Sequence, residues 1–269
     1  MKAESREPRA ESPLWDGFSA HQLAASCNVP TLHLFDDIGS TLDVAHTLAE
    51  QGALSGTTVL ADAQHAGRGR MGRTWSSHHG VGVWCTVIER VVPSEALDVL
   101  SLRVGLEIAE RMDALAGKPV GVKWPNDLML DGGKLGGVLV EARWAGDRLG
   151  WVAIGVGVNV LGAPDVPGST SLSPRLKPRA ESREPRAPRR FPALMAIVAG
   201  IRAAASATGH LSAQEMTRYG SRDTLRGKQI VEPLAGAVSG IAANGALVVE
   251  TEKGTQHVRT GTIRLAEGR

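Results

Sequence analysis

The segment at 67–73, Gly-Arg-Gly-Arg-Met-Gly-Arg, constrains the fold more than any other feature of the chain. Its glycines have the GxGxxG spacing of a dinucleotide-binding loop, which is a weak signal by itself. A dinucleotide-binding loop leads directly into a helix whose N-terminus receives the pyrophosphate. Here a polar stretch at 74–80 and a predicted strand at 82–89 follow instead. The sequence therefore argues against a doubly wound dinucleotide-binding fold.

Short strands joined by tight turns dominate the predicted secondary structure. A helix is expected to begin at a capping box formed by Ser40 and to end before Gly52, and further helices are expected at 94–115 and 191–205. Strands are expected at 57–62, 82–89, 120–124, 127–131, 137–143 and 149–160. Tight turns between neighbouring strands are typical of antiparallel pairing. The pattern predicts an α+β fold with a mixed, largely antiparallel sheet flanked by helices.

After about residue 225 the pattern changes to short strands separated by glycine turns. Strands are expected at 228–232, 237–242, 246–250 and 257–259, with an Asn-Gly turn at 244–245. This pattern predicts a small β-barrel. We therefore expect an N-terminal extension at 1–30, a main domain at 31–220 and the barrel at 221–269.

One segment accounts for the basic character of the chain. The formal net charge is +2, but residues 173–190 contain seven basic and two acidic residues, a local charge of +5. The octapeptide AESREPRA occurs at 3–10 and again at 180–187. We interpret 173–190 as a disordered insertion, with a basic interaction arm as the alternative. Two cysteines, a charged N-terminus and the absence of a long apolar run favour a cytoplasmic protein without a membrane span.

Arg68, Arg70 and Arg73 alternate with the glycines of the 67–73 segment. Guanidinium groups bind phosphate oxygens through paired hydrogen bonds, and a mobile loop can shield a reactive anionic intermediate from water. We interpret the segment as a phosphate-binding loop; a solvated basic turn is the alternative.

Two further elements carry lysines. Lys-Trp-Pro-Asn-Asp at 123–127 places a lysine, an amide and a carboxylate at a strand end, where they could hold a nucleotide phosphate and Mg²⁺. Gly-Gly-Lys-Leu-Gly-Gly at 132–137 allows close approach of a ligand, because glycine has no Cβ. A surface turn and a hairpin tip are the respective alternatives. The adjacent His78 and His79 are poorly placed to ligate one metal together, and we interpret them as loop residues.

In this order and at similar spacing, the three elements resemble the biotin protein ligase family. Ser40-Thr41 before the first helix, Gln64 ahead of the arginine loop and Gly-Val-Asn at 157–159 match as well. The resemblance covers about residues 36–268. It implies a class II synthetase-like biotin/lipoate ligase catalytic domain followed by an SH3-like β-barrel.

The resemblance also implies a role for each matching residue. The catalytic residues would be Lys134, Arg70 and Lys123. The biotin site would comprise Ser40, Thr41, Gln64, Gly67, Arg68, Gly69, Arg70, Lys134 and Gly137. ATP and the adenylate would contact Arg70, Arg73, Trp75, Lys123, Asn126, Asp127 and Asn159. Asp127 would also bind Mg²⁺.

The implied activity is that of an ATP-dependent biotin–[acetyl-CoA-carboxylase] ligase. Biotin and MgATP would give biotinyl-5′-AMP and pyrophosphate, and a lysine of a biotin carrier domain of a carboxylase would then displace AMP. Positioning and charge stabilisation would supply most of the catalysis. A homodimer through the catalytic-domain sheet is a further expectation.

Two departures from the family pattern stand out. Leu42 occupies a position where many members have asparagine. The residues before Phe35 do not fit the winged helix-turn-helix of members that repress transcription, so we expect a short form without specific DNA binding. A lipoate or octanoate ligase of the same fold is the nearest alternative. A non-enzymatic nucleic-acid-binding protein is disfavoured, because 225–269 lacks Phe, Tyr and Trp for base stacking.

Overall fold

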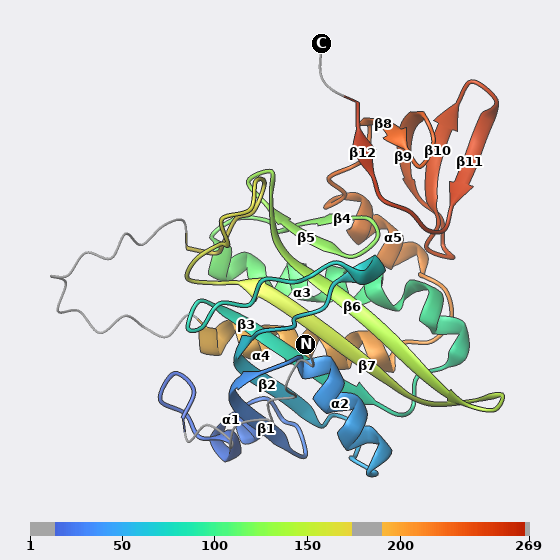
Figure 1. The fold of residues 1–269 in the computed structure, drawn as a ribbon. Coiled ribbons are helices and arrows are strands. Elements are labelled where there is room, and N and C mark those ends of the chain that lie inside the picture. The colour runs from blue at the N-terminus through green and yellow to red at the C-terminus, as the bar shows by residue number, and fades with distance from the viewer. Residues whose placement is uncertain (1–13, 174–189, 267–269) are drawn as a thin grey trace, which may run out of the picture.

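A seven-stranded mixed sheet forms the centre of the protein (Figure 1). The computed structural model describes residues 14–173 and 190–266. The strand order is β1-β2-β3-β7-β6-β5-β4, with β1 and β2 parallel and every other neighbouring pair antiparallel. The predicted mixed, largely antiparallel sheet is therefore confirmed. Its strands are β1 (Leu32–Ile38), β2 (Thr58–Gln64), β3 (Gly82–Glu89), β4 (Gly121–Lys123), β5 (Asp127–Leu130), β6 (Gly133–Ala145) and β7 (Arg148–Asn159).

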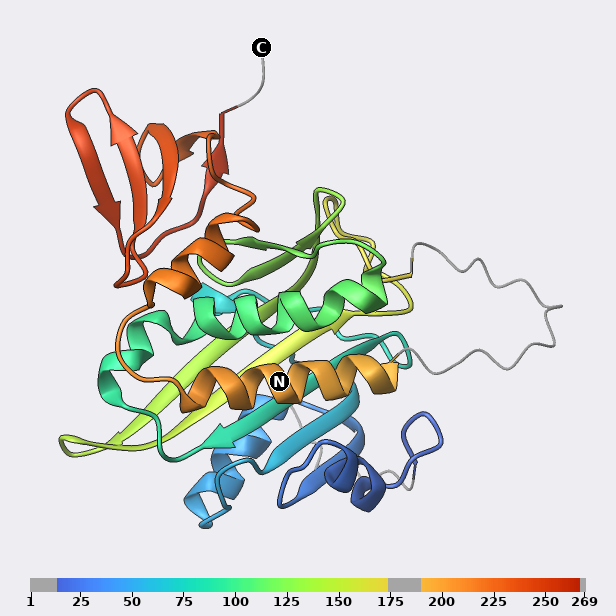
Figure 2. The same cartoon turned by 180° about the vertical axis from the view of Figure 1, so that it is seen from behind.

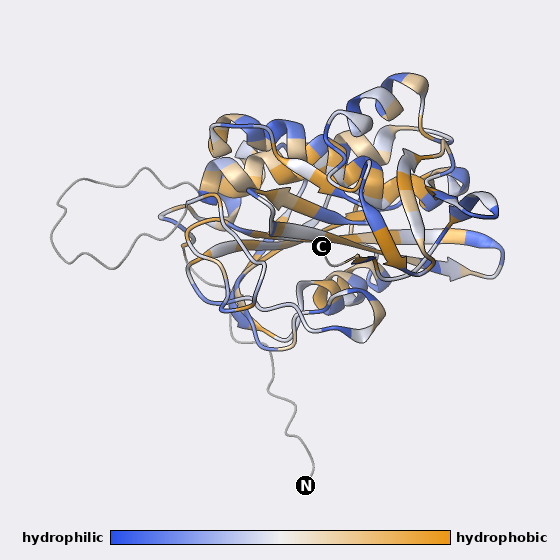
Figure 3. Ribbon diagram, turned by 90° about the horizontal axis from the view of Figure 1, so that it is seen from above, coloured by the Kyte–Doolittle hydropathy of each residue, from blue (hydrophilic) through white to orange (hydrophobic). Residues whose placement is uncertain are grey.

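Helices cover both faces of this sheet. The long helices α3 (Leu97–Ala116) and α4 (Arg190–Ser206) lie side by side across one face (Figure 2). On the other face, α2 (Thr41–Glu50) buries Leu42, Ala45 and Ala49 in a separate, smaller core. Hydrophobic residues are concentrated in the central strands between these layers (Figure 3). The sheet is consequently apolar on both faces, which is why β3 is buried along its whole length.

The turn between β5 and β6 is shorter than the sequence pattern predicted. Asp131 and Gly132 both have positive φ angles, 51° and 76°, as in a two-residue type I′ hairpin turn. Pairing continues to Gly133, which lies opposite Leu130, and Lys134 lies opposite Met129. The expectation that β6 begins at 137 was wrong, and Lys134 is in a strand.

Ser40 begins α2 as predicted, but it forms no capping box. Its side chain makes no hydrogen bond to the helix N-terminus, and Asp43, the expected reciprocal partner, forms an ion pair with Arg68. The helix start was predicted correctly and its capping interaction was not.

Residues before β1 pack into the main domain through Arg190. The helix α1 (Ala20–Ser26) was not predicted. Trp15 is buried with the Arg190 guanidinium 4.5 Å from its ring centroid, and Arg190 forms ion pairs with Asp16 and Asp62. Ser173 and Arg190, the first and last residues of the expected insertion, are both buried. The expectation of a solvated segment was wrong for these two ends, whereas 174–189 and both copies of AESREPRA lie outside the described residues.

A second sheet of five antiparallel strands follows α5 (Ala213–Gly220) and fits an SH3-like fold, as predicted. The indole nitrogen of Trp124 donates to the carbonyl of Gly245 over 2.9 Å, which joins the two parts of the structure. Within the described residues, no helix is long and apolar enough to cross a membrane. The strand order is β11-β10-β9-β8-β12, with β8 (Gln229–Glu232), β9 (Gly236–Ile241), β10 (Leu247–Thr251), β11 (Gly254–Val258) and β12 (Arg264–Leu265).

Candidate active site

One pocket brings together the three motifs of the sequence. It lies between the start of α2, the arginine loop, the β4–β5 turn and the neighbouring strands β6 and β7. Most of the predicted site residues line it: Ser40, Thr41, Gln64, Arg68, Gly69, Arg70, Arg73, Trp75, Lys123, Asn126, Asp127, Lys134 and Gly137.

Two predicted residues lie behind the pocket wall. A Cβ on Gly67 would approach the Trp75 carbonyl oxygen to 2.5 Å, so this glycine permits close packing at the loop base. The Asn159 amide nitrogen donates to the Thr170 carbonyl over 3.0 Å, and its Oδ1 is buried without a partner.

Residues 261–263, from the C-terminal part of the chain, also line the pocket and were not predicted from the sequence. The Arg73 guanidinium donates to the Thr262 hydroxyl over 2.5 Å. No local pattern marks these residues, because their role depends on how the small sheet packs against the arginine loop.

A buried polar network lines the end of the pocket at α2. The Gln64 side-chain oxygen accepts from the Thr41 backbone NH at 2.8 Å and from the Thr41 hydroxyl at 3.1 Å. Thr86 donates to Thr41, and the Gln64 amide donates to Ser77. The Ser40 hydroxyl is buried and has no hydrogen-bond partner among the described residues. Because buried polar groups are nearly always hydrogen-bonded, Ser40 is suited to bind a polar group of a ligand.

Trp75 forms an aromatic wall against two glycines. A Cβ on Gly157 would lie 2.4 Å from the Trp75 indole nitrogen, and one on Gly137 would lie 3.5 Å from its ring. The Lys134 ammonium lies 5.3 Å from the ring centroid, and Trp84 packs edge-on against it. The glycines on β6 and β7 are therefore what allow the indole to lie close to the sheet.

The opposite end of the pocket is cationic. Lys134 Nζ lies 2.6 Å from Asp127, and Arg70 donates to the Asn126 side-chain oxygen over 3.4 Å. Burial lowers the pKa of Arg70; Asp127 opposes this shift and Arg73 adds to it. A half-buried guanidinium whose charge is offset by only one nearby carboxylate favours binding of an anion such as phosphate.

Arg68 differs from the other two loop arginines. Its guanidinium lies 3.0 Å from Glu141 and 3.0 Å from Asp43, so both sides of the fork are engaged by carboxylates. The sequence predicted that all three arginines bind phosphate. In the structure carboxylates occupy Arg68, which leaves Arg70 and Arg73 as the candidates for phosphate binding.

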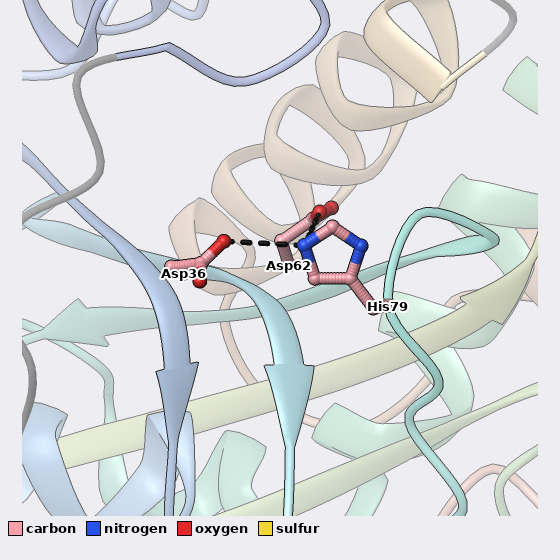
Figure 4. Close-up of side chains that lie close together, drawn as sticks. All are labelled: Asp36, Asp62 and His79. Atoms are coloured by element: carbon pink, nitrogen blue, oxygen red, sulfur yellow. Dashed lines mark hydrogen bonds and ion pairs between the residues drawn. The ribbon is translucent and has the colours of Figure 1, made fainter.

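His79 lies outside this pocket, in a charged cluster at the β1–β2 edge of the sheet (Figure 4). Its Nε2 is 3.1 Å from Asp36 and 2.9 Å from Asp62, close enough for the three side chains to share a cation. Asp62, however, is already paired with Arg190. His78 bonds Ser76 instead, so the two adjacent histidines have separate partners.

Known proteins resemble this chain in sequence and in fold. The sequence model described as the biotin/lipoate A/B protein ligase family matches residues 36–159, the part of the chain that carries the predicted motifs. Two solved structures share its fold. Biotin protein ligase from Aquifex aeolicus in complex with biotin and ATP superposes with a TM-score of 0.67 and 24% identity, over 89% of this chain and 100% of that one. Biotin protein ligase from Leishmania major in complex with biotinyl-5-AMP superposes with a TM-score of 0.57 and 22% identity, over 89% of this chain and 99% of that one.

Curated relatives are more similar in sequence over shorter stretches. The bifunctional ligase/repressor BirA of Bacillus subtilis (strain 168) is 40% identical over 131 residues, which are 48% of this chain and 40% of that protein. A biotin–[acetyl-CoA-carboxylase] ligase of Mycobacterium tuberculosis is 38% identical over 142 residues, 50% of this chain and 52% of that protein. The chain thus spans about half or less of the length of these relatives.

Proposed function

We propose that this protein is a biotin protein ligase. It would adenylate biotin with MgATP and transfer biotin to a lysine of a biotin carrier domain. One observation carries the proposal: a single pocket joins a buried polar network, which contains the unpartnered Ser40 hydroxyl, to a cationic end. This arrangement matches a ligand with a polar head, an apolar body and a carboxylate that must meet a nucleotide phosphate.

The end of the pocket at α2 would bind the ureido head of biotin. The Ser40 hydroxyl would supply one hydrogen bond to the ureido group, and Thr41 and Gln64 hold one another in position beside it. Leu42 is buried against Gly155 and gives the pocket an apolar floor. The fatty-acid-like chain of biotin would lie over this floor towards Trp75 and Lys134.

The cationic end would bind the triphosphate of ATP. A biotin carboxylate oxygen would attack the α-phosphorus and expel pyrophosphate, and Lys134 and Arg70 would stabilise the negative charge on the reacting phosphate. Lys123 would contact the outer phosphates. In the second step, the neutral amine of the carrier lysine would attack the biotinyl carbonyl carbon, expel AMP and lose a proton. Preorganised charge and orientation would account for both steps.

Asp127 and Asn126 fit a magnesium ion that is held mainly by substrate phosphates. Mg²⁺ usually binds through one or two carboxylates together with phosphate oxygens and water. Asp127 offers one such carboxylate at the pocket wall, although Lys134 pairs with it here. When bound, the ion would neutralise phosphate charge.

A paired measurement tests the proposal. The protein is incubated with MgATP and either biotin, lipoate or octanoate, pyrophosphate release is followed, and transfer to a biotin carrier domain is read with streptavidin. We expect turnover with biotin alone; turnover with lipoate or octanoate only would refute the proposal in favour of the related ligases.

Two lysines provide a matched comparison within this assay. Lys134 pairs with Asp127 at 2.6 Å inside the pocket, whereas Lys118 pairs with Asp131 at 2.7 Å outside it. Lys134→Met should reduce adenylation by a factor of roughly 10² to 10³, as expected for the loss of a charge-stabilising group. Lys118→Met should leave it unchanged. Equal effects of the two substitutions would contradict the assigned role of Lys134.

A further inference from the structure

A chain of hydrogen bonds leads from the sheet to the base of the arginine loop. It comprises Trp151 on β7, His46 on α2, Glu141 on β6 and Arg68, and we call it the His46 relay. Trp151 Nε1 lies 3.0 Å from His46 Nδ1, His46 Nε2 lies 2.8 Å from Glu141, and Glu141 lies 3.0 Å from the Arg68 guanidinium. Of these four residues, only Arg68 lines the substrate pocket.

The direction of each hydrogen bond follows from the indole. An indole N–H can only donate, so His46 Nδ1 must be the acceptor and carry no proton. The neutral ring therefore carries its proton on Nε2 and donates it to Glu141. Trp151 thus fixes both the tautomer and the orientation of His46, whose ring is buried.

Glu141 is held in the ionised state that Arg68 requires. Burial alone would raise the pKa of Glu141, but the hydrogen bond from His46 and the charges of Arg68 and Arg143 together lower it below its usual value. Arg143 is more distant, at 3.6 Å, and half-exposed. His46 is therefore the main neutral hydrogen-bond donor that orients this carboxylate.

The residue held by the relay lies at the base of the loop. Backbone bonds close the loop between the Trp75 NH and the Gly67 oxygen at 2.8 Å and between the Gly69 NH and the Arg73 oxygen at 2.7 Å. Arg68 lies between these two closures, opposite Thr74. A shift of its guanidinium would therefore move both the Trp75 wall and the position from which Arg70 and Arg73 extend.

We propose that His46 is a positioning residue that, through Glu141, fixes Arg68 and hence the arginine loop for substrate binding. The effect on substrates rests on the proposed biotin ligase function. Arg68 lines the pocket, and its neighbour Gly67 lies beside Gln64, at the end of the pocket assigned to biotin. Loss of the relay should therefore weaken biotin binding more than ATP binding.

The test compares four variants of the full chain. His46→Phe removes both hydrogen bonds. We expect the KM for biotin to rise about tenfold, the order of one lost hydrogen bond to a charged group, and the KM for ATP to rise by a smaller factor. His46→Gln retains one donor and one acceptor and should stay within about threefold of wild type. Trp151→Phe keeps an aromatic ring but frees the His46 tautomer and should give an intermediate effect. Arg148→Gln, the control, removes an exposed charge at the start of β7 and should have no effect.

A second readout does not depend on activity. Amide hydrogen exchange at Gly69 and Trp75 should accelerate in His46→Phe and Trp151→Phe and stay at the wild-type rate in Arg148→Gln. If His46→Phe does not fold, Trp151→Phe and His46→Gln still decide the question.

Several results would overturn the inference. The inference fails if Trp151→Phe and His46→Phe both keep wild-type rates of amide exchange and a wild-type KM for biotin. Failure of His46→Gln to restore a low KM would show that ring packing, and not hydrogen bonding, is what matters. If the wild-type protein shows no biotin-dependent turnover, the proposed function fails, whereas the exchange measurement still tests the relay.

Discussion

Gly157 allows Trp75 to lie against β7, and replacing it with alanine tests the geometry of the pocket directly. The new Cβ would lie 2.4 Å from the Trp75 indole nitrogen and 2.6 Å from Cε2, where ordinary contacts begin at 3.4 Å. The indole would have to retreat by roughly 1 Å, the difference between these values. It cannot do so freely, because Lys134 and Trp84 lie against it.

The size of the effect follows from this displacement. Inserting a methyl group into a packed site costs about 1–3 kcal/mol. If a ligand restores the original indole position, the whole cost falls on binding, and affinity should drop by roughly 5- to 150-fold. If the protein relaxes instead, the same cost appears in its stability. We expect the loss of binding free energy and the loss of unfolding free energy to add up to about 1–3 kcal/mol.

The assay measures urea unfolding and biotin binding by calorimetry for Gly157→Ala and for a matched control, Gly105→Ala. Gly105 lies in the middle of α3. Apart from its chain neighbours and the backbone of its own helix, no described residue comes within 4 Å of a Cβ there, so this alanine should stabilise the protein by about 1 kcal/mol without changing binding. Wild-type stability and binding in Gly157→Ala would show that Trp75 does not rest on this glycine, which would refute the reasoning.

Three further predictions concern the loop, the insertion and acid stability. Arg70→Gly should release the adenylate into solution, so that biotin labels lysines of added bystander proteins; labelling confined to the carrier domain would contradict the retention role of Arg70. Replacing 174–189 by an uncharged Gly-Ser segment of equal length should leave the adenylation rate within about twofold of wild type, because the buried residues at both ends are kept. A large fall in the adenylation rate would indicate that the segment is a basic interaction arm. Asp113→Asn should lower the free energy of unfolding at pH 7 by about 1 kcal/mol. Burial raises the pKa of Asp113, but hydrogen bonds from Arg222 and Val120 lower it below its usual value, so the stabilisation is present above about pH 4 and disappears as the pH falls through the folded-state pKa. Urea unfolding of wild type and variant at pH 7 and pH 3 checks this. An equal difference in unfolding free energy between the two proteins at both pH values would refute it.

The sequence was sufficient for features whose cause is local. The strand at 82–89 was predicted with its observed bounds, because a short apolar run with β-branched residues between turn signals indicates a strand locally. The Asn-Gly turn at 244–245 was predicted for the same kind of reason: Gly245 has a φ of 81°. The motif residues also identified most of the pocket, since they lie at strand ends and turns that local patterns locate.

Features that depend on neighbours distant in sequence were decided by the tertiary structure. The strand β3 pairs with β7 and not with its successor β4, and this pairing places Gly157 opposite Trp84 and beneath Trp75. The arginines look equivalent in the loop, yet Arg68 alone lies where α2 and β6 present carboxylates.

The sequence by itself therefore identified most of the polar residues that line the pocket. Only the tertiary structure decided which of them remain available to a ligand: Ser40 and Arg70 do, whereas Arg68 is bound by Asp43 and Glu141. The physical reason is one of range. Backbone conformation follows from residues a few positions apart, but a charged side chain takes its partners from whatever the packing of helices and strands brings within about 4 Å.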